Sequence, residues 1–430
     1  MGARRCLTLS GRQAVVMKQF MIFETVCGSA IGLLRKTAMI PSGLSTFALL
    51  CLGVLGAATA SAGPAPSLGI EVAGQPETIY EWTRNRCDPR ETVDAPPRAF
   101  RDSSGTVHLY ASHDTLRQFL GRSLDDVRYD CRAIRRSTQD DRPEMYADHQ
   151  WLAAPYTVDG RVIYALVHNE FQGNLRPALC PSRQYIRCWF NALTLMISRN
   201  GGQSYEQPAP PAHLVAALPY RYVGDIGFPV GYFQPSNIVE LSGYYYALIR
   251  ATRYLDQPNG VCVMRTMDLA DPASWRAWNG SDFSVRFIDP YTAKIDDPRQ
   301  HLCSPVKGDL ATMGGMARDK ASGAFVLITK GAVGRPQQDP VLGIWARTSY
   351  DLVDWSNPVL VWADPSGGKN EGDPRATDRD PSLLDPTSDS RNFDTIGSRP
   401  YVYFVRMNPD NRPYDRRLMR VPIRITVTAP

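Results

Sequence analysis

Three stretches of the chain repeat one pattern at long intervals. Each ends a short apolar segment at Ser or Thr, passes through a polar turn with Asn or Asp, and then reaches an aromatic residue. The stretches are SRNGGQSY (198–205), TMDLADPASWRAW (266–278) and TSYDLVDWS (348–356). Their markers Ser198, Thr266 and Ser349 stand 68 and 83 residues apart. A period of this length, with several strands inside it, is typical of propeller blades and not of a two-sheet sandwich.

The segments between these turns have the composition of strands. Stretches such as GTVHLYAS, RVIYALVH and RPYVYFVRM are short, rich in β-branched and aromatic residues, and bounded by Gly, Pro, Asp or Ser. Only HDTLRQFLG, residues 113–121, is expected to be helical. With a repeat of roughly 70 residues, the roughly 360 residues after the N-terminal leader would make five blades. The sequence therefore predicts an all-β fold, a five-bladed β-propeller of four-stranded antiparallel blades.

The N-terminus has the pattern of an export signal. Arg35 and Lys36 precede the run LSTFALLCLGVLGAATASA, which ends in small residues at 60–62 and is too short and too rich in small residues for a confident membrane span. Residues 1–62 are expected to be a signal peptide, with an upstream extension if Met39 is the true start. Residues 63–77 would be a linker and 78–430 a single propeller domain. A secreted or periplasmic location follows, with an uncleaved anchor as the alternative.

The expected blades follow one another along this domain. They are predicted at 78–140, 146–207, 222–282, 303–363 and 376–425.

Charge and cysteine content narrow the partners and the compartment. Without residues 1–62 the chain keeps 42 basic and 42 acidic residues, so a nucleic-acid partner is not expected. Six cysteines remain, and an even number after a signal peptide predicts disulfides. Sequence order favours the pairs Cys87–Cys131, Cys180–Cys188 and Cys262–Cys303, although six cysteines allow 15 pairings. A zinc site is the weaker alternative, because no Cys-x-x-Cys occurs.

Two of the turns resemble known propellers. SRNGGQSY resembles the Asp-box of sialidases, with Asn200 and Tyr205 substituted, and TSYDLVDWS resembles the blade-ending turn of five-bladed glycosidases of the arabinanase/fructosidase type. The resemblance implies a propeller glycoside hydrolase-like protein without a specific family. It supports the fold more than the activity, because such turns usually lie far from the sugar site. It also implies that a Ca²⁺ ion could occupy the central channel.

The polar residues expected at the channel mouth come from strand ends. First strands are expected at RAFRD, HQWLAAPY, QPSNIVEL, LATMGGMARD and DPSLLDP. The start of a first strand lies beside the end of the antiparallel second strand. The stretch 148–149 is therefore expected to lie beside 168–170, which brings two carboxylates and two imidazoles together.

Glycoside hydrolysis needs paired carboxylates, one protonated and one ionised. Asp148 and Glu170 are the predicted catalytic pair, and Asp309 is a further catalytic candidate. For each carboxylate a turn or capping role is the competing interpretation. The predicted substrate-binding residues each have a polar side chain that is expected near the channel mouth: Arg101, His149, His168, Asn169, Asn237, Arg250, Lys330 and Asp380.

These observations predict a secreted, monomeric enzyme that hydrolyses glycosidic bonds in polysaccharides or oligosaccharides and requires no cofactor. A divalent ion held by His149, His168, Asp148 and Glu170 is the expected metal alternative. No Walker loop, dinucleotide-binding glycine turn or Gly-x-Ser-x-Gly elbow occurs in the sequence. The alternative function is a non-catalytic propeller that binds carbohydrate or protein at the same mouth.

Overall fold

The computed structural model describes residues 65–111, 113–308, 310, 312–334, 339–369, 377–408 and 413–429. Within these ranges the chain is built of strands, with one short helix, α1 (Trp82–Asn85), and several 3₁₀ turns. The all-β prediction is confirmed. Among the described helices, none has the length and apolar character of a membrane span. The expected signal peptide lies outside the described residues, as does Asp309.

The strands fall into groups along the chain. The first group is β3 (Arg98–Arg101), β4 (Val107–Tyr110), β5 (Thr115–Gly121) and β6 (Arg128–Arg136). The second is β7 (His149–Tyr156), β8 (Ile163–Gln172), β9 (Trp189–Ser198) and β10 (Leu214–Ala216). The third is β11 (Val230–Phe233), β12 (Val239–Leu241), β13 (Tyr244–Ala251), β14 (Gly260–Thr266), β15 (Arg276–Trp278) and β16 (Phe283–Val285). A short parallel pairing of β9 with β11 joins the second and third groups into one sheet.

Two further groups complete the described chain. The fourth group is β17 (Thr312–Asp319), β18 (Phe325–Val333), β19 (Val341–Ser349) and β20 (Val359–Ala363), with β22 (Thr395–Ile396) added beside β17. The fifth is β21 (Asp378–Leu384), β23 (Tyr401–Met407) and β24 (Arg416–Thr428). Within each group, successive long strands pair antiparallel. The groups largely coincide with the ranges expected from the sequence.

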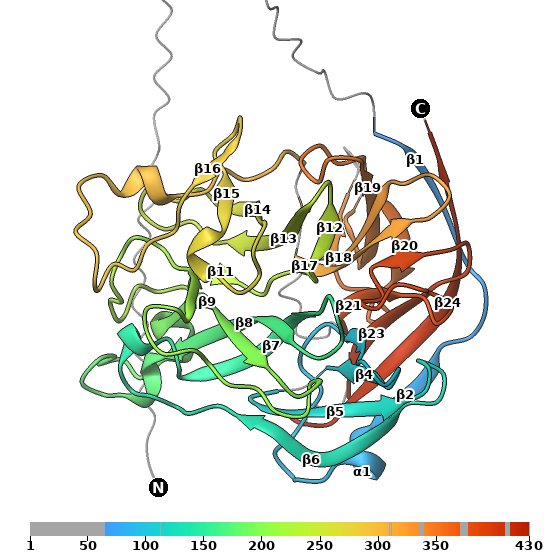
Figure 1. Ribbon diagram of the computed structural model, residues 1–430, viewed down its shortest axis with the longest axis horizontal. Helices are drawn as coiled ribbons and strands as arrows, with labels where there is room; N and C mark the ends of the chain where they lie inside the picture. Colours follow the sequence, from blue (N-terminus) through green and yellow to red (C-terminus); the bar gives the residue numbers. More distant parts are fainter. Residues whose placement is uncertain are drawn as a thin grey trace, which may run out of the picture. The chain divides into compact units, whose positions relative to one another are not determined.

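The groups follow one another around a common centre in chain order, and the last lies beside the first (Figure 1). Apolar clusters fill the spaces between neighbours. One cluster joins each of the pairs one–two, two–three, three–four and four–five. Another joins group five to group one, through Tyr403 and Val405 on one side and Leu109 and Phe119 on the other. The ring is therefore closed by burial of apolar surface between its first and last members.

Two N-terminal strands complete the last group. β1 (Ser67–Val72) and β2 (Glu77–Glu81) both pair antiparallel with the long strand β24. This corrects two expectations: part of the predicted linker is a strand, and the chain around residue 78 belongs to the last group and not to the first. Because β1 and β2 are so far from β24 in the sequence, no local pattern predicts that they pair.

The expected helix at 113–121 is wrong. Leu116 and Phe119 have helical spacing, but residues 115–121 form β5 between β4 and β6. Residues 116–119 are all buried. Tertiary pairing on both edges, with packing on both faces, overrides a short local pattern.

The repeat found in the sequence marks equivalent positions. Ser198, Thr266 and Ser349 are the last residues of β9, β14 and β19, which are the third long strands of three successive groups. Each hydroxyl accepts a backbone N–H hydrogen bond of 2.9 Å from the turn that follows, from Gly202, Asp268 and Leu352 respectively. The sequence repeat therefore corresponds to a hydrogen bond that is shared by the ends of these three strands.

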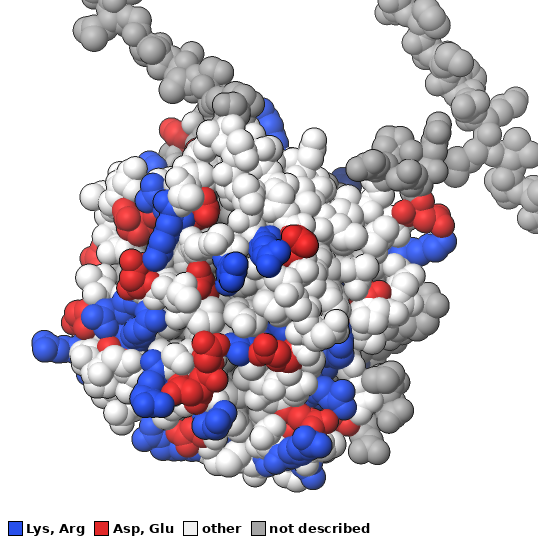
Figure 2. Space-filling model, turned by 90° about the vertical axis from the view of Figure 1, so that its right-hand side faces the viewer, with Lys and Arg blue, Asp and Glu red and all other residues white. Residues whose placement is uncertain are grey.

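The three favoured disulfides are confirmed as Cys87–Cys131, Cys180–Cys188 and Cys262–Cys303. The charged surface also agrees with the near-equal charge counts. On the face shown in Figure 2, Lys and Arg side chains are interspersed with Asp and Glu.

Arg98, the first residue of β3, connects four of the five groups. Its guanidinium is buried and donates to the Ala153 carbonyl on β7 (3.1 Å), the Ser382 hydroxyl on β21 (2.9 Å) and the Gly314 carbonyl on β17 (2.7 Å). Burial lowers the pKa of Arg98 to about 9, and the nearby carboxylate of Asp380 opposes this shift. The side chain thus holds the innermost strands together where the groups converge.

Close packing at this centre requires glycine. A Cβ on Gly314 would lie 2.0 Å from the Ile328 carbonyl oxygen and 2.7 Å from that of Pro381. A Cβ on Gly315 would lie 2.4 Å from the Ser382 hydroxyl. These two glycines therefore let β17 approach β21 closely enough for Arg98 to reach both strands.

We expect Arg98→Met to lower the free energy of unfolding by about 3 kcal/mol or more, because it leaves several buried acceptors without a donor. Denaturant unfolding of the purified protein measures this. Arg122→Met is the control, since the Arg122 side chain is 95% exposed and should contribute almost nothing. A loss below about 1 kcal/mol for the Arg98 variant would contradict this account of the centre.

Candidate functional site

A cavity of about 1060 Å³ lies where the strand groups converge, and residues from all five groups or their adjoining loops border it. Its carboxylates are Asp94, Glu170 and Asp380, and its cationic side chains are Arg250, Arg253, Lys330 and Arg379. Five of the residues predicted for the site lie on its wall: His168, Glu170, Arg250, Lys330 and Asp380. The cavity is therefore the candidate site.

Glu170 lies towards the end of β8 and pairs with His149 on β7, as the antiparallel argument predicted. Its Oε2 accepts hydrogen bonds from Gln172 Nε2 (3.1 Å) and the Tyr185 hydroxyl (3.0 Å). Burial raises the pKa of Glu170 to about 7, with these hydrogen bonds opposing the shift in part. Near neutral pH a large fraction of this group is therefore a protonated carboxylic acid.

His168 lies two residues before Glu170 on the same face of β8, with its Nε2 3.6 Å from Glu170 Oε1. This nitrogen is buried and has no hydrogen-bond partner among the described residues. Burial lowers the pKa of His168 to about 4, although the Asn191 side chain opposes the shift. The imidazole is therefore neutral near pH 7 and does not stabilise the ionised form of Glu170 as a cation would.

Asp148 lies behind this wall and not on it. Its two oxygens accept hydrogen bonds from the Arg176 guanidinium at 2.6 and 2.7 Å. They also accept from His149 Nδ1 (2.9 Å) and from the backbone N–H of Gln172 (2.8 Å). Burial alone would raise the pKa of Asp148, but these hydrogen bonds hold it below its usual value. A carboxylate held this way anchors the strand ends. The structure therefore does not bring the predicted pair, Asp148 and Glu170, together on the cavity wall.

Three other predicted residues serve the scaffold. Asn237 bonds both backbone groups of Met316 on β17, at 2.7 and 2.8 Å. Arg101 donates to the Ser390 carbonyl (2.8 Å) and lies 4.1 Å over the Phe393 ring. Asn169 accepts from the backbone N–H of Asp148 at 3.1 Å. None of the three borders the cavity, and neither does His149.

Asp380 reaches the cavity through an irregularity in β21. The pairing of β21 with β23 shifts register between Arg379 and Ser382, and Asp380 itself has φ of +51°. That left-handed conformation is unfavourable for a residue other than glycine, and a bulge re-aims the side chains that it carries. Burial raises the pKa of Asp380, with Arg379, Lys330 and Arg98 opposing the shift.

Asp94 is a wall residue that the sequence reasoning missed. It lies in the loop before β3, forms an ion pair with Arg416, and has its Oδ2 3.6 Å from His113 Nε2. The ion pair stabilises the carboxylate form. Its position just before a first strand, which is also the position of Asp148, is the signal that could have identified it.

A run of rings forms much of the remaining wall. Tyr185 stacks on Trp189 with ring centroids 4.7 Å apart, and Trp189 meets Phe233 at 5.6 Å. Phe233 in turn lies 5.9 Å from His168, which lies 6.0 Å from Trp151. Flat faces with polar tips suit ligands that present both C–H groups and hydroxyls.

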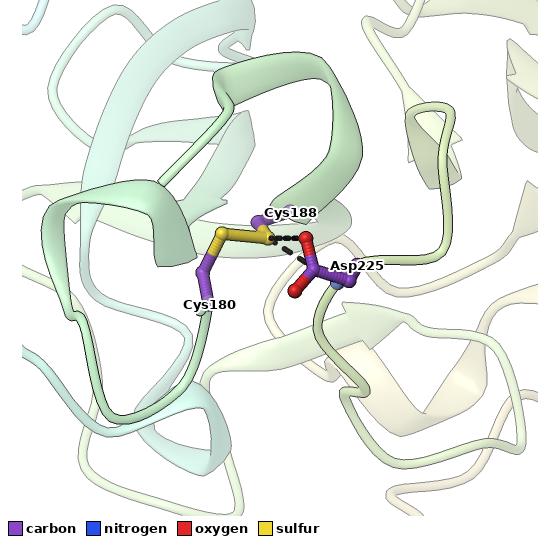
Figure 3. A group of neighbouring side chains, drawn as sticks. All are labelled: Cys180, Cys188 and Asp225. Carbon is purple, nitrogen blue, oxygen red and sulfur yellow. Dashed lines mark hydrogen bonds between the residues drawn. A yellow bond between two sulfur atoms is a disulfide. The ribbon is translucent and has the colours of Figure 1, made fainter. Parts of the chain in front are cut away.

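The expected metal set does not assemble, because the oxygens of Asp148 are taken by Arg176 and its neighbours. Among the described residues, one group of potential ligands lies close together, namely Cys180, Cys188 and Asp225 (Figure 3). Its two sulfur atoms form a disulfide, whereas cysteine binds a metal as the free thiolate. The Asp225 amide instead donates to Cys188 Sγ at 3.2 Å. These three residues therefore do not fit zinc, and the Ca²⁺ ion that the resemblance implies for the central channel stays a prediction.

No protein-family model matches the chain, and no curated protein matches it. Solved structures do. One is a protein of unknown function from Dyadobacter fermentans, with 12% identity, a TM-score of 0.48, and coverage of 83% of this chain and 100% of that one.

Two others are carbohydrate enzymes. An α-L-arabinanase of Cellvibrio cellulosa complexed with arabinohexaose shows 12% identity and a TM-score of 0.41, over 76% of this chain and 91% of its own. An α-L-arabinofuranosidase of Podospora anserina in complex with cellotriose shows 10% identity and a TM-score of 0.45, over 81% of this chain and 95% of its own. The solved structures that are similar to this chain thus include enzymes of the type that the two turns resemble. At these values the similarity carries no argument about activity, which has to come from the cavity.

The raised pKa of Glu170 makes a prediction about stability. Folded protein binds the Glu170 proton more tightly than unfolded protein does. The stability that this proton confers is therefore fully present below about pH 4 and is lost as the pH rises through about 7. Glu170→Gln should therefore become more stable than the wild type over this interval, by about 3 kcal/mol at most. Unfolding measured at pH 4.5, 6 and 8 tests this. A difference that does not change with pH would contradict the assignment.

Proposed function

We propose that the five strand groups are the blades of a five-bladed β-propeller and that the protein is a secreted glycoside hydrolase acting on polysaccharides or oligosaccharides. The apolar clusters that close the ring of groups support the propeller. The three disulfides support an oxidising compartment outside the cytosol.

One observation carries the proposed chemistry: Glu170, a buried carboxyl on the cavity wall, has its pKa raised to about 7. A glycosidase needs an acid that still holds its proton near neutral pH and can give it to the departing glycosidic oxygen. In this proposal Glu170 is that acid. The hydrogen bonds from Tyr185 and Gln172 fix Oε2, which leaves Oε1 to carry the proton.

The second carboxylate is Asp94. Its ion pair with Arg416 stabilises the ionised form that a base or nucleophile requires, whereas burial makes Asp380 a poorer candidate by raising its pKa. Asp94 would either take a proton from the attacking water or attack the anomeric carbon itself. The separation of the two carboxyl groups in the substrate complex decides between these outcomes.

The same wall would also suit a non-catalytic carbohydrate-binding propeller. Stacking rings and hydroxyl-binding groups serve both functions equally. Hydrolysis is favoured because binding alone gives no reason to bury a carboxyl group and raise its pKa towards neutrality.

We expect the wild-type chain, tested on a panel of polysaccharides and aryl glycosides, to hydrolyse at least one substrate. Glu170→Gln should lower kcat on that substrate by about 10²- to 10⁴-fold. Glu71→Gln is the matched control, since that carboxylate is exposed at the edge of β1. Full activity of the Glu170 variant would show that another residue is the acid. If the wild type hydrolyses no substrate, the non-catalytic carbohydrate-binding function would be favoured.

The pH profile gives an independent check. Because the acid acts only when protonated, kcat/KM on the cleaved substrate should fall as the pH rises through about 7. Asp94→Asn should remove activity without moving this limb in whatever activity remains. A profile that is flat between pH 6 and 8 would exclude Glu170 as the acid.

A further inference from the structure

Two large apolar side chains on the cavity wall face water. Phe228 and Leu255 both border the cavity, and their exposed fractions are 44% and 66%. Exposed polar side chains such as that of Arg253, which also borders the cavity, are ordinary on a protein surface. Large apolar side chains that lie together at a cavity and stay exposed are typical of a surface that an apolar partner covers.

Phe228 and Leu255 stand at the same end of one antiparallel strand pair. β11 pairs with the end of β13, with Tyr232 opposite Ala251. Four residues beyond this pair on each strand lie Phe228 and Leu255. The two chains therefore carry both side chains to the same side of the cavity.

Leu255 is held in a backbone conformation that leucine rarely adopts. Residues 254–257 form a two-residue turn, closed by backbone hydrogen bonds between Tyr254 and Gln257 at 2.9 and 3.2 Å. Leu255 is the first central residue of this turn and has φ of +49°. Glycine or asparagine is usual at such positions, because a bulky side chain makes positive φ unfavourable. Strain of this kind concentrates at ligand-binding sites.

Buried contacts fix this turn in place. Gln257 is buried, accepts a hydrogen bond from the Tyr232 hydroxyl (2.9 Å) and donates one to the Cys303 carbonyl (3.0 Å). The disulfide between Cys262 and Cys303 ties the same segment to β14. Leu255 is therefore presented by a preorganised support, and a ligand that contacts it does not first have to order the turn.

Three rings, the ring row Tyr185, Trp189 and Phe233, connect Glu170 to this strand pair. The Tyr185 hydroxyl donates to Glu170, and the Tyr185 ring stacks on Trp189. Trp189 in turn contacts Phe233 on β11. The polar tips of the first two rings are engaged inside the protein, because Trp189 Nε1 donates to Asn191 Oδ1 at 2.6 Å. The ring row therefore offers a ligand mainly apolar surface.

The position of Glu170 at the start of the ring row decides which part of a substrate lies along it. In the proposed hydrolysis, Glu170 gives its proton to the glycosidic oxygen, the bond from the anomeric carbon to that oxygen breaks, and an alcohol leaves. Water supplies the hydroxyl that replaces this alcohol on the sugar, and the other proton of the water makes up for the one that Glu170 gave. The departing alcohol therefore lies against the acid and the rings that continue from it.

We propose that this departing alcohol is apolar, and that the protein cleaves the bond between the last sugar of an oligosaccharide and an aryl or alkyl alcohol. The alcohol lies along the ring row, and its far end reaches Phe228 and Leu255. This inference rests on the proposed function and names the substrate class for the same site. A further sugar ring suits this end of the cavity less well, because leucine has no flat face and neither side chain can hydrogen-bond a hydroxyl.

The test is calorimetric binding to the full chain carrying Glu170→Gln, which removes the proposed acid. The probes are methyl, hexyl and benzyl glycosides of glucose, galactose, xylose, mannose and arabinose in both anomeric forms, with hexanol and benzyl alcohol as sugar-free probes. For at least one sugar, the hexyl or benzyl glycoside should bind more tightly than the methyl glycoside by about tenfold or more. The free alcohols should bind more weakly than the matching glycosides by about tenfold or more.

Variants locate the apolar group. Added to Glu170→Gln, the change Leu255→Asn should reduce the preference for hexyl over methyl glycosides roughly tenfold and leave the affinity for methyl glycosides unchanged. Phe228→Ala should act in the same way. Val158→Asn is the matched control, since Val158 is 67% exposed in the turn at the opposite end of β8 from Glu170. It should change neither affinity.

A stability measurement separates binding from a structural role of Leu255. Asparagine tolerates the left-handed conformation better than leucine does, so Leu255→Asn should not lower the free energy of unfolding although it weakens hexyl-glycoside binding. A Leu255→Asn variant that is less stable and binds all glycosides equally weakly would show a purely structural residue and overturn the inference.

The outcomes separate this inference from the proposed function. Equal binding of the methyl, hexyl and benzyl glycosides of every sugar, no binding of any glycoside, or free alcohols that bind as tightly as the glycosides would each overturn it. If the wild type hydrolyses a polysaccharide and shows no preference for apolar glycosides, hydrolysis stands and this inference fails. If the apolar glycosides bind with the expected variant effects but the wild type cleaves none of them, the site for the apolar group stands and hydrolysis fails.

Discussion

The ring depends on one buried cation at its centre. Arg98 reaches three other strand groups because two glycines at 314–315 allow β17 and β21 to approach each other, and it satisfies acceptors that no local strand pairing serves. The apolar clusters between groups supply most of the burial, but they are broad and tolerant of small shifts. Directional hydrogen bonds from a single guanidinium fix where the innermost strands stand relative to one another.

Arg98 also acts on the candidate site. Asp380 lies within the field of Arg98, and it is presented by the bulge that follows from the irregular pairing of β21. Arg176 holds Asp148 and so fixes the adjoining strand ends that carry His168 and Glu170. Arg98 and Arg176 thus position strands that carry Asp380 and Glu170, two of the carboxyl groups on the cavity wall.

Several features of this architecture could be predicted because they are local or nearly so. Strand endings carry a repeated Ser or Thr, disulfides join cysteines that follow one another, and antiparallel pairing puts Glu170 beside His149. What failed depended on distant partners. The engagement of Asp148 by Arg176, the pairing of Asp94 with Arg416 and the strand at 115–121 are set by neighbours that no short pattern encodes.

The pairing of β1 with β24 has a consequence for how the molecule is made. Ser67 lies opposite Thr428, so the earliest described strand has no partner until almost the last described residue has been synthesised. Contacts this distant in sequence are slow to form, because a long loop must close first. A chain released early, or cut near its C-terminal strand, would present an open sheet edge to proteases and chaperones. The sheet edge at β1 is therefore covered only when the whole of β24 is present.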